Sequence, residues 1–328
     1  MIKRVLINCT KIAFALGLVL WLVNSGKIDM ELVYKSFQNP LNVIFILAFM
    51  LFDQFIVAIR WKHILESKAK SSLNLLNVFK ANWIGIFFNS VLPGSVTGDL
   101  IKIFYIEQKN EKLSKKFLLG SVLLDRVIGL CGLILVGGLS CIIYYNFLAA
   151  QSEELKSLVH VNFLLSLAVI IAFIFLYNFN SIPLQLSSFV KKRMTFLTSL
   201  LEKLEVVWRD LVSLKGRLLK VLFLSMIVQA VAILIFWYVI HGLIGDEFQL
   251  YHAFSILPVG MISMAIPIAP AGLGVGHVVF LNLFSYIGIS NGANLFNVYF
   301  IYVILMNLSG IFPYILHQGE NKPLISRK

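Results

Sequence analysis

Long runs of apolar residues dominate the chain and set its predicted elements. A helix needs about 20 such residues to cross the hydrocarbon core of a bilayer, and runs near that length recur along the sequence at 5–23, 41–59, 117–147, 161–177, 221–240 and 296–316. Backbone polar groups at membrane depth must be satisfied inside the protein, so helices are expected there. The pattern predicts an all-α integral membrane protein with about six transmembrane helices.

The first apolar run has two interpretations. Lys3 and Arg4 precede it, as basic residues precede the apolar part of a signal peptide. However, VNSG at Val23–Gly26 offers no small-residue cleavage site, and further spans follow. We therefore expect a retained membrane anchor.

Two further apolar stretches are interrupted at their centres by proline and glycine. They read NSVLPGSVTGD at Asn89–Asp99 and PIAPAGLGVGH at Pro267–His277, in matching places of the two halves of the chain. Non-helical backbone at membrane depth survives only where protein or a water-filled cavity surrounds it. In membrane transporters, paired interruptions of this kind point to a substrate site built from broken helices.

Charges in the flanking segments orient these interruptions. Arg60, Lys62 and Lys68 precede the first and Lys109 and Lys112 follow it, whereas the second lies between an acidic loop and an uncharged one. Positive charge favours the cytoplasmic side, which predicts a re-entrant helical hairpin at 82–107 entering from the cytoplasm and one at 252–289 entering from outside. Of the 28 Lys and Arg, those in loops that we expect outside are Lys27, Lys35 and Lys156. Both termini are therefore expected in the cytoplasm.

The order of elements predicts an inverted repeat. Residues 1–148 contain two spans, a hairpin and a third span, and residues 149–328 repeat that order. An odd number of crossings in each half inverts the second half relative to the first. Between the halves, apolar residues share one helical face over 186–215, which indicates an amphipathic helix either on the cytoplasmic membrane surface or packed as a linker on the bundle.

Composition supports a membrane protein. The chain has 328 residues, 59% of them hydrophobic and 13% charged, with a mean hydropathy of +0.87. This is more apolar surface than a soluble core of this size would hold. The net charge of +12 needs no nucleic-acid partner, since the loop asymmetry accounts for it and it favours contact with anionic lipid headgroups.

The first interruption carries a candidate anion site. A half-helix starting after Pro93 and Gly94 would direct backbone amides into the protein, where a phosphate is the obvious ligand. Asp99 in that first turn either stabilises the helix end or takes part in the site. Lys102 lies one helical turn on and can pair with Asp99 or meet a lipid phosphate.

Asp125 and Arg126 are adjacent ionisable residues in the third span, close to the expected midplane. Side chains of sequence neighbours point about 100° apart on a helix, so each needs another partner. They are either elements of a functional path or members of an inter-helix ion pair. Asp53 shares a helical face with Arg60, which itself is either a snorkelling anchor or a ligand.

The second interruption adds a histidine and a glycine series. His277 either contacts a headgroup or carries a proton, or it packs at a helix start, and the glycines favour close helix packing. No metal-ligand spacing, nucleotide-binding loop or nucleophile motif is present. Together with Asp53 and Arg60, the candidate substrate-binding residues are Asn89, Pro93, Gly94, Gly98, Asp99, Lys102, Asp125, Arg126, Pro267, Pro270, Gly272, Gly274, Gly276 and His277.

These motifs, with LLDRVIGL at Leu123–Leu130, make nearly the whole chain resemble the lysylphosphatidylglycerol synthase transmembrane-region family, often called flippase-like. The resemblance implies a multi-pass inner-membrane protein related to the domain that moves aminoacylated phosphatidylglycerol between leaflets. This chain departs from the family at Thr97, where glycine is common, at Lys102, where arginine is common, and at His277, where glutamate is common.

We therefore expect a lipid translocator for a phospholipid or a polyprenyl-phosphate-linked lipid, without a cofactor or metal. No soluble acyltransferase domain follows the last span, so lipid aminoacylation is not expected. Two other interpretations stay open: a membrane-embedded lipid-linked glycosyl- or phosphotransferase, and a non-catalytic partner of a lipid-modifying enzyme. The expected partners are anionic membrane lipids, with a homo-oligomer or such an enzyme as further candidates.

Overall fold

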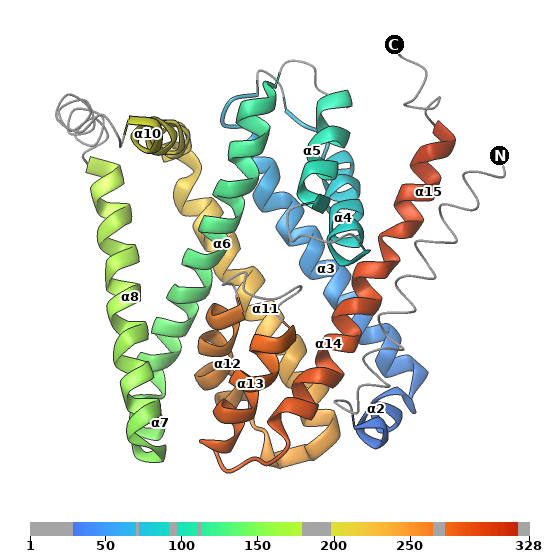
Figure 1. Cartoon of the computed structure of the whole chain (residues 1–328), viewed down its shortest axis with the longest axis vertical. Helices are drawn as coiled ribbons and strands as arrows, with labels where there is room; N and C mark the ends of the chain where they lie inside the picture. Colours follow the sequence, from blue (N-terminus) through green and yellow to red (C-terminus); the bar gives the residue numbers. More distant parts are fainter. Residues whose placement is uncertain are drawn as a thin grey trace.

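The computed structural model describes residues 29–69, 72–91, 97–109, 113–178, 198–264 and 273–320. Within these ranges every regular element is a helix, as the apolar pattern predicts. Most of the long helices run along the long axis of the molecule and pack side by side (Figure 1).

Five segments in the described ranges are long and apolar enough to cross a membrane. They are α3 (Pro40–Leu65), α6 (Lys115–Ile143), α8 (Glu153–Asn178), the segment Lys215–Glu247 built from η2 (Lys215–Arg217), α11 (Leu218–Ile244) and η3 (Gly245–Glu247), and the segment Gly292–Leu316 from α14 (Gly292–Ser309) into α15 (Ile311–Glu320). They match five of the six predicted spans. The remaining one, 5–23, lies outside the described residues.

Local capping explains where these helices begin. The side chain of Asn39 accepts hydrogen bonds from the backbone amides of Leu41 and Asn42, and Pro40 occupies the first turn of α3, where a missing N–H costs nothing. The predicted span 117–147 is longer than the helix found. α6 ends at Ile143, and the chain turns at Tyr144 into the short helix α7 (Tyr145–Gln151).

The two interrupted segments each appear as a pair of shorter helices. α4 (Leu75–Val91) packs on α5 (Thr97–Lys109), and α12 (Leu250–Met264) packs on α13 (Leu273–Ser285). α4 begins at Leu75, seven residues before the predicted boundary at 82. At this start the side chain of Asn74 accepts a hydrogen bond from the amide of Leu76. The first pair lies in the half of the bundle that also carries α10 (Thr198–Ser213), and the second pair lies in the opposite half (Figure 1).

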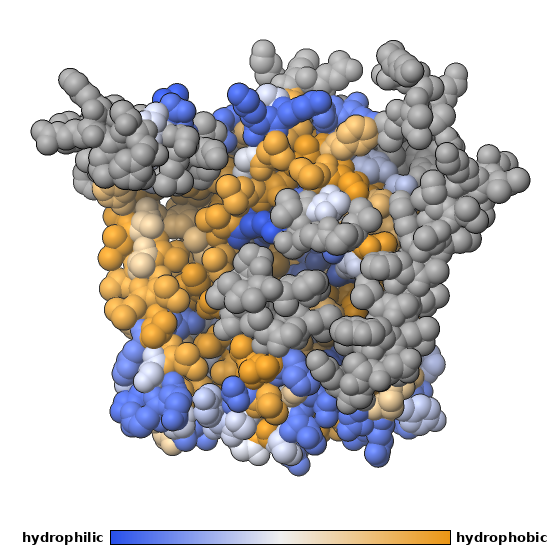
Figure 2. Space-filling model, viewed as in Figure 1, coloured by the Kyte–Doolittle hydropathy of each residue, from blue (hydrophilic) through white to orange (hydrophobic). Residues whose placement is uncertain are grey.

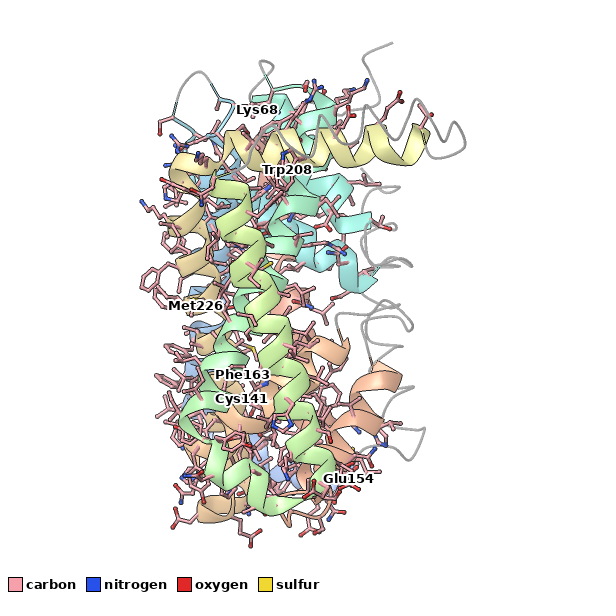
Figure 3. The ribbon with its side chains drawn as sticks, turned by 90° about the vertical axis from the view of Figure 1, so that its left-hand side faces the viewer. Lys68, Cys141, Glu154, Phe163, Trp208 and Met226 are labelled. Atoms are coloured by element: carbon pink, nitrogen blue, oxygen red, sulfur yellow. The ribbon has the colours of Figure 1, made fainter. Side chains whose placement is uncertain are left out.

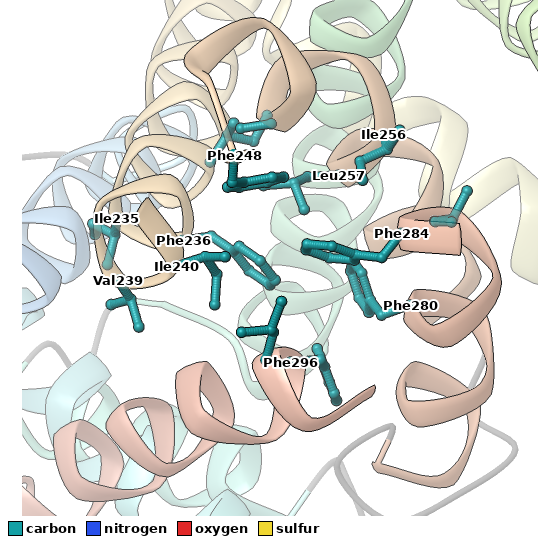
Figure 4. Packing of buried hydrophobic residues seen from close by; sticks show 14 of the residues in the cluster. Ile235, Phe236, Val239, Ile240, Phe248, Ile256, Leu257, Phe280, Phe284 and Phe296 are labelled. Atoms are coloured by element: carbon teal, nitrogen blue, oxygen red, sulfur yellow. The ribbon is translucent and has the colours of Figure 1, made fainter. Parts of the chain in front are cut away.

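A cluster of phenylalanines joins the second pair to the bundle. Phe236 of α11 lies 5.4 Å from Phe280 of α13, and Phe280 lies 4.7 Å from Phe296 of α14, measured between ring centroids. Figure 4 shows these rings facing one another together with Phe284. Gly292 allows α14 to approach α13 closely, because a Cβ at position 292 would lie 2.4 Å from the Cβ of Phe284 in α13.

The amphipathic segment predicted at 186–215 contains α10 at Thr198–Ser213. Residues 186–197 of that prediction lie outside the described ranges. α10 runs across the end of the bundle, crosswise to α8 (Figure 3). Lys68 pairs with the buried carboxylate of Asp210, and Trp208 lies 6.2 Å from Phe175 of α8 between ring centroids. The helix is therefore packed on the bundle at this end.

On the face shown in Figure 2, an apolar band lies between two hydrophilic ends. Leu164 and Ile171 of α8 are 66% and 56% exposed, and several other apolar residues of this helix are exposed as well. An apolar surface this extensive requires a nonpolar surrounding. At one end of the band α2 (Met30–Phe37) adds a short capped helix whose Lys35 donates to the carbonyl of Leu243.

Candidate functional site

Asp99, Lys102 and Arg126 form a charged cluster between α5 and α6. Lys102 Nζ lies 3.2 Å from Asp99 Oδ1, so the predicted pairing one helical turn apart is confirmed. Arg126 donates from a terminal guanidinium nitrogen to Asp99 Oδ2 at 2.5 Å. The side chains of Asp99 and Lys102 are buried. Two cations thus share a single carboxylate among these three residues.

Trp61 of α3 packs against the Lys102 side of this cluster. The ammonium group of Lys102 lies 4.6 Å from the centre of the Trp61 ring, a distance at which the ring quadrupole attracts a cation. The indole N–H of Trp61 donates to Ser121 Oγ of α6 at 3.2 Å, which fixes the plane of the ring. Sequence reasoning missed Trp61 and Ser121, whose separation of 60 positions leaves no local signal.

Asp125 faces the other way and pairs with Arg60. Arg60 Nε donates to Asp125 Oδ1 at 2.8 Å, and another guanidinium nitrogen donates to Ser225 Oγ of α11 at 2.8 Å. Gly129 makes room for the guanidinium, since a Cβ there would lie 3.2 Å from it. Arg60 is 5% exposed, so its interpretation as a snorkelling anchor at the membrane interface is wrong. The sequence places Arg60 near the end of a helix, but it does not show that the carboxylate of Asp125 on α6 is its partner.

Arg126 is the exposed member of the cluster. Its side chain is 46% exposed, compared with 7% for Asp99 and for Lys102. The neighbouring outward positions on α6 are apolar and also exposed, namely Leu119, Leu123, Val127 and Leu130. A hydrophilic patch interrupts the apolar band on the face shown in Figure 2. The arrangement therefore presents a cation among side chains suited to acyl chains.

Glycine lets α4 and α5 approach closely behind the cluster. A Cβ on Gly98 would lie 1.9 Å from the carbonyl oxygen of Gly85 and 2.7 Å from the backbone of Asn89. The side-chain oxygen of Asn89 accepts a hydrogen bond from the amide of Gly98 at 2.8 Å. The backbone amides at the start of α5 are the groups that the sequence analysis expected to bind an anion. Asn89 already satisfies one of them, the amide of Gly98. Pro93 and Gly94 lie outside the described residues.

Asp53 lies deeper in α3, on the same face as Arg60 as its spacing predicted. The residue is 8% exposed, and within the part of the chain that the structure describes no donor reaches its Oδ1 atom. The neighbouring Gln54 instead accepts a hydrogen bond from Asn82 of α4 at 3.2 Å.

The second interruption contributes less to a described site. His277 in α13 is half-buried, and its Nδ1 lies 3.3 Å from the side-chain nitrogen of Asn297 in α14. Gly276 is buried, and Gly274 lies in the first turn of α13. Pro267, Pro270 and Gly272 lie outside the described residues. In the parts of the chain that the structure describes, no group of three or more His, Cys, Asp or Glu side chains is placed to hold a metal ion.

Comparison with known proteins agrees with this architecture. Residues 8–308 match the family model for the lysylphosphatidylglycerol synthase TM region, which covers both interrupted segments and all of the charged cluster. No curated protein and no solved structure matches significantly. With its apolar spanning helices and this match over most of its length, the chain is a multi-pass membrane protein that belongs to the lysylphosphatidylglycerol synthase TM-region family.

Proposed function

We propose that this protein is a lipid translocator that moves a phospholipid or a polyprenyl-phosphate-linked lipid between leaflets. The observation that carries the proposal is the cluster of Asp99, Lys102 and Arg126, in which two cations share one carboxylate and the outer cation is exposed among apolar side chains. A lipid phosphate can bind Arg126 in a bidentate manner while its acyl chains stay in contact with α6.

The cluster is suited to passing a headgroup rather than to holding it permanently. Asp99 competes with a phosphate for both cations, so the binding of an anionic headgroup exchanges one ion pair for another. Such an exchange keeps each charge compensated at every stage, which lowers the cost of a polar group at membrane depth. Ionisable groups in membrane segments are functional candidates for this reason.

The position of the two helix pairs supports a path between two halves. We interpret α4 and α5 as a re-entrant hairpin from one face of the membrane, and α12 and α13 as a hairpin from the other, which gives inverted halves at 1–148 and 149–328. The pairs lie in opposite halves of the bundle (Figure 1). A headgroup between them would meet α5 and α6 from one half and α13 and α14 from the other.

The charges at the two ends suggest the orientation. Lys62, Lys68, Lys115 and Arg217 lie at the end that carries α10 (Figure 1). The opposite end carries Lys35 and Lys156 together with the acids Asp29, Glu31, Glu153, Asp246 and Glu247. By the positive-inside rule the first end faces the cytoplasm. We propose a location in the cell membrane, with both termini and α10 on the cytoplasmic side.

The test is leaflet transfer in liposomes. Purified protein is reconstituted with fluorescent phosphatidylglycerol, phosphatidylcholine or a polyprenyl phosphate, and a membrane-impermeant quencher reports which leaflet holds the label. We expect faster transfer of the anionic lipids than in protein-free vesicles. Transfer equal to that in protein-free vesicles for every lipid would contradict the proposal. Chemical conversion of the lipid would instead indicate a glycosyl- or phosphotransferase, and a need for an added enzyme would indicate a non-catalytic partner.

A further inference from the structure

Asp53 is a buried carboxyl group that the charged cluster does not use. It lies in the middle of α3 among the core residues Met50 and Ile56, and the residue is 8% exposed. No described donor reaches its Oδ1 atom. An isolated carboxylate in such a position is strongly unfavourable unless it is paired.

The cation on the same helical face does not pair with Asp53. Arg60, seven residues on, lies on the same face of α3, but its hydrogen bonds go to Asp125 and Ser225. Arg60 and Asp125 compensate each other, and this leaves the charge of Asp53 without a dedicated partner. The arrangement differs from that of Asp99, which has two cations in contact.

Among the residues that the structure describes, the other elements packed on α3 offer Asp53 no cation. Tyr299 of α14 carries a hydroxyl group and no positive charge. On α4, Lys80 is exposed, and on α11, Lys220 is exposed while His241 contacts the carbonyl of Phe248. On α2, Lys35 donates to the carbonyl of Leu243. The least costly way to compensate the carboxylate is therefore the addition of a proton.

We propose that Asp53 is a proton-binding site coupled to the anionic headgroup. The Asp53 carboxylate takes a proton from the aqueous phase and becomes a neutral carboxyl group, and no bond of the lipid changes. The proton returns to water when the headgroup leaves. The coupling of this proton to a bound lipid headgroup rests on the proposed function, whereas the proton-binding site itself does not.

A series of neighbouring charges lies between the two sites. Asp53 shares a face of α3 with Arg60, Arg60 bonds to Asp125, and the residue after Asp125, Arg126, bonds to Asp99. Charges inside a low-dielectric bundle are screened much less than surface charges. An anion bound at Arg126 therefore makes a negative charge at Asp53 less favourable and a proton there more favourable. By reciprocity, a proton on Asp53 strengthens binding of the anion to the same extent.

The first test is infrared spectroscopy of the purified protein over a pH series. Wild-type protein should show the carbonyl-stretch band of a protonated carboxyl group, and the band should disappear on titration to high pH and be absent from Asp53→Asn. Asp53→Glu should keep a titrating band at a shifted frequency. Asp210→Asn is the matched control, because Asp210 is also buried but pairs with Lys68, and it should leave the band unchanged. The same band in Asp53→Asn as in wild type would overturn the proton site.

The second test adds short-chain phosphatidylglycerol, with phosphatidylcholine as the uncharged comparison. We expect the phosphatidylglycerol to shift the titration of the Asp53 band to higher pH. Its affinity should fall by up to about tenfold per pH unit as the proton leaves, and this dependence should vanish in Asp53→Asn. An unshifted band would overturn the coupling. A titrating Asp53 band without leaflet transfer by wild-type protein would overturn the proposed function and leave the proton site in place.

Discussion

The guanidinium group of Arg60 on α3 and the carboxylate of Asp125 on α6 form a buried ion pair, with Nε and Oδ1 2.8 Å apart. Because neighbouring side chains on a helix diverge by about 100°, this pairing turns the next residue, Arg126, toward α5 and its Asp99. The two adjacent charges of α6 therefore have different surroundings. Asp125 joins helices inside the bundle, and Arg126 is the half-exposed cation of the charged cluster.

The buried pair should be needed for stability. Asp125→Asn leaves the Arg60 charge uncompensated and should lower the free energy of unfolding by about 3–5 kcal/mol. The double variant Arg60→Met, Asp125→Leu should recover much of this loss, because apolar side chains of similar volume replace both charges. Thermal or denaturant unfolding in detergent measures the effect.

An exposed ion pair provides the control for this prediction. Lys156 and Glu153 lie 3.2 Å apart, and Glu153 is 83% exposed, so Glu153→Gln should change stability little. Asp125→Asn with the stability of wild type would show that the pair with Arg60 contributes nothing.

The contact of α4 with α5 should tolerate no side chain at Gly98. Gly98→Ala would place a Cβ 1.9 Å from the carbonyl oxygen of Gly85, which belongs to the helix backbone of α4 and cannot turn aside as a flexible side chain could. We expect a marked loss of thermal stability, since the helices must separate. Gly242→Ala in α11 is the matched control, because nothing lies within 4 Å of the added atom and alanine favours the helix. Equal melting of the two variants would contradict the close approach.

How far the sequence predicted this structure depends on the range of each interaction. The apolar runs, the two interruptions and the pair of Asp99 with Lys102 are local patterns. Five of the six runs, the helices that flank each interruption and the pair all appear in the described residues. The partner of Asp125 lies 65 positions away and that of Arg126 lies 27 positions away, so only the packing of helices reveals them.

Two residues illustrate what local patterns cannot supply. Asn89 belongs to a motif that suggested a ligand, yet its side chain caps the amide of Gly98. Arg60 has the spacing of a helix-end anchor, yet the bundle buries it. In both cases the deciding partner comes from another helix.

The proposed inverted arrangement predicts opposite accessibility of two exposed serines. Ser72 precedes α4 and Ser290 precedes α14. In a protein without native cysteines, Ser72→Cys should react with a membrane-impermeant thiol reagent only from the cytoplasmic side, and Ser290→Cys only from outside. Labelling of intact cells and of inverted vesicles measures this. Reaction of both from one face would contradict the opposed hairpins.

Protonation of Glu66 by acid should destabilise the loop that follows α3, because the Glu66 carboxylate accepts hydrogen bonds from that loop. Burial alone would raise the pKa of Glu66, but hydrogen bonds from the Leu73 amide and the Ser72 hydroxyl, with the charge of Lys62, hold its pKa below the usual value of 4.5. A depressed pKa gives stability that is present above the ordinary pKa and is lost as pH falls through the folded value. Melting temperature should therefore fall less steeply with acid in Glu66→Gln than in wild type. Identical slopes would contradict this role.

Leaflet transfer of fluorescent phosphatidylglycerol by Arg126→Gln in liposomes tests the proposed role of the charged cluster most directly. Because the lipid headgroup is proposed to bind this exposed cation, we expect transfer at least about tenfold slower than wild type, the equivalent of roughly 1.4 kcal/mol, with an unchanged melting temperature. Arg209→Gln is the matched control, since Arg209 on α10 is 67% exposed and lies outside the cluster, and it should transfer lipid at the wild-type rate. Wild-type transfer by Arg126→Gln would contradict the account.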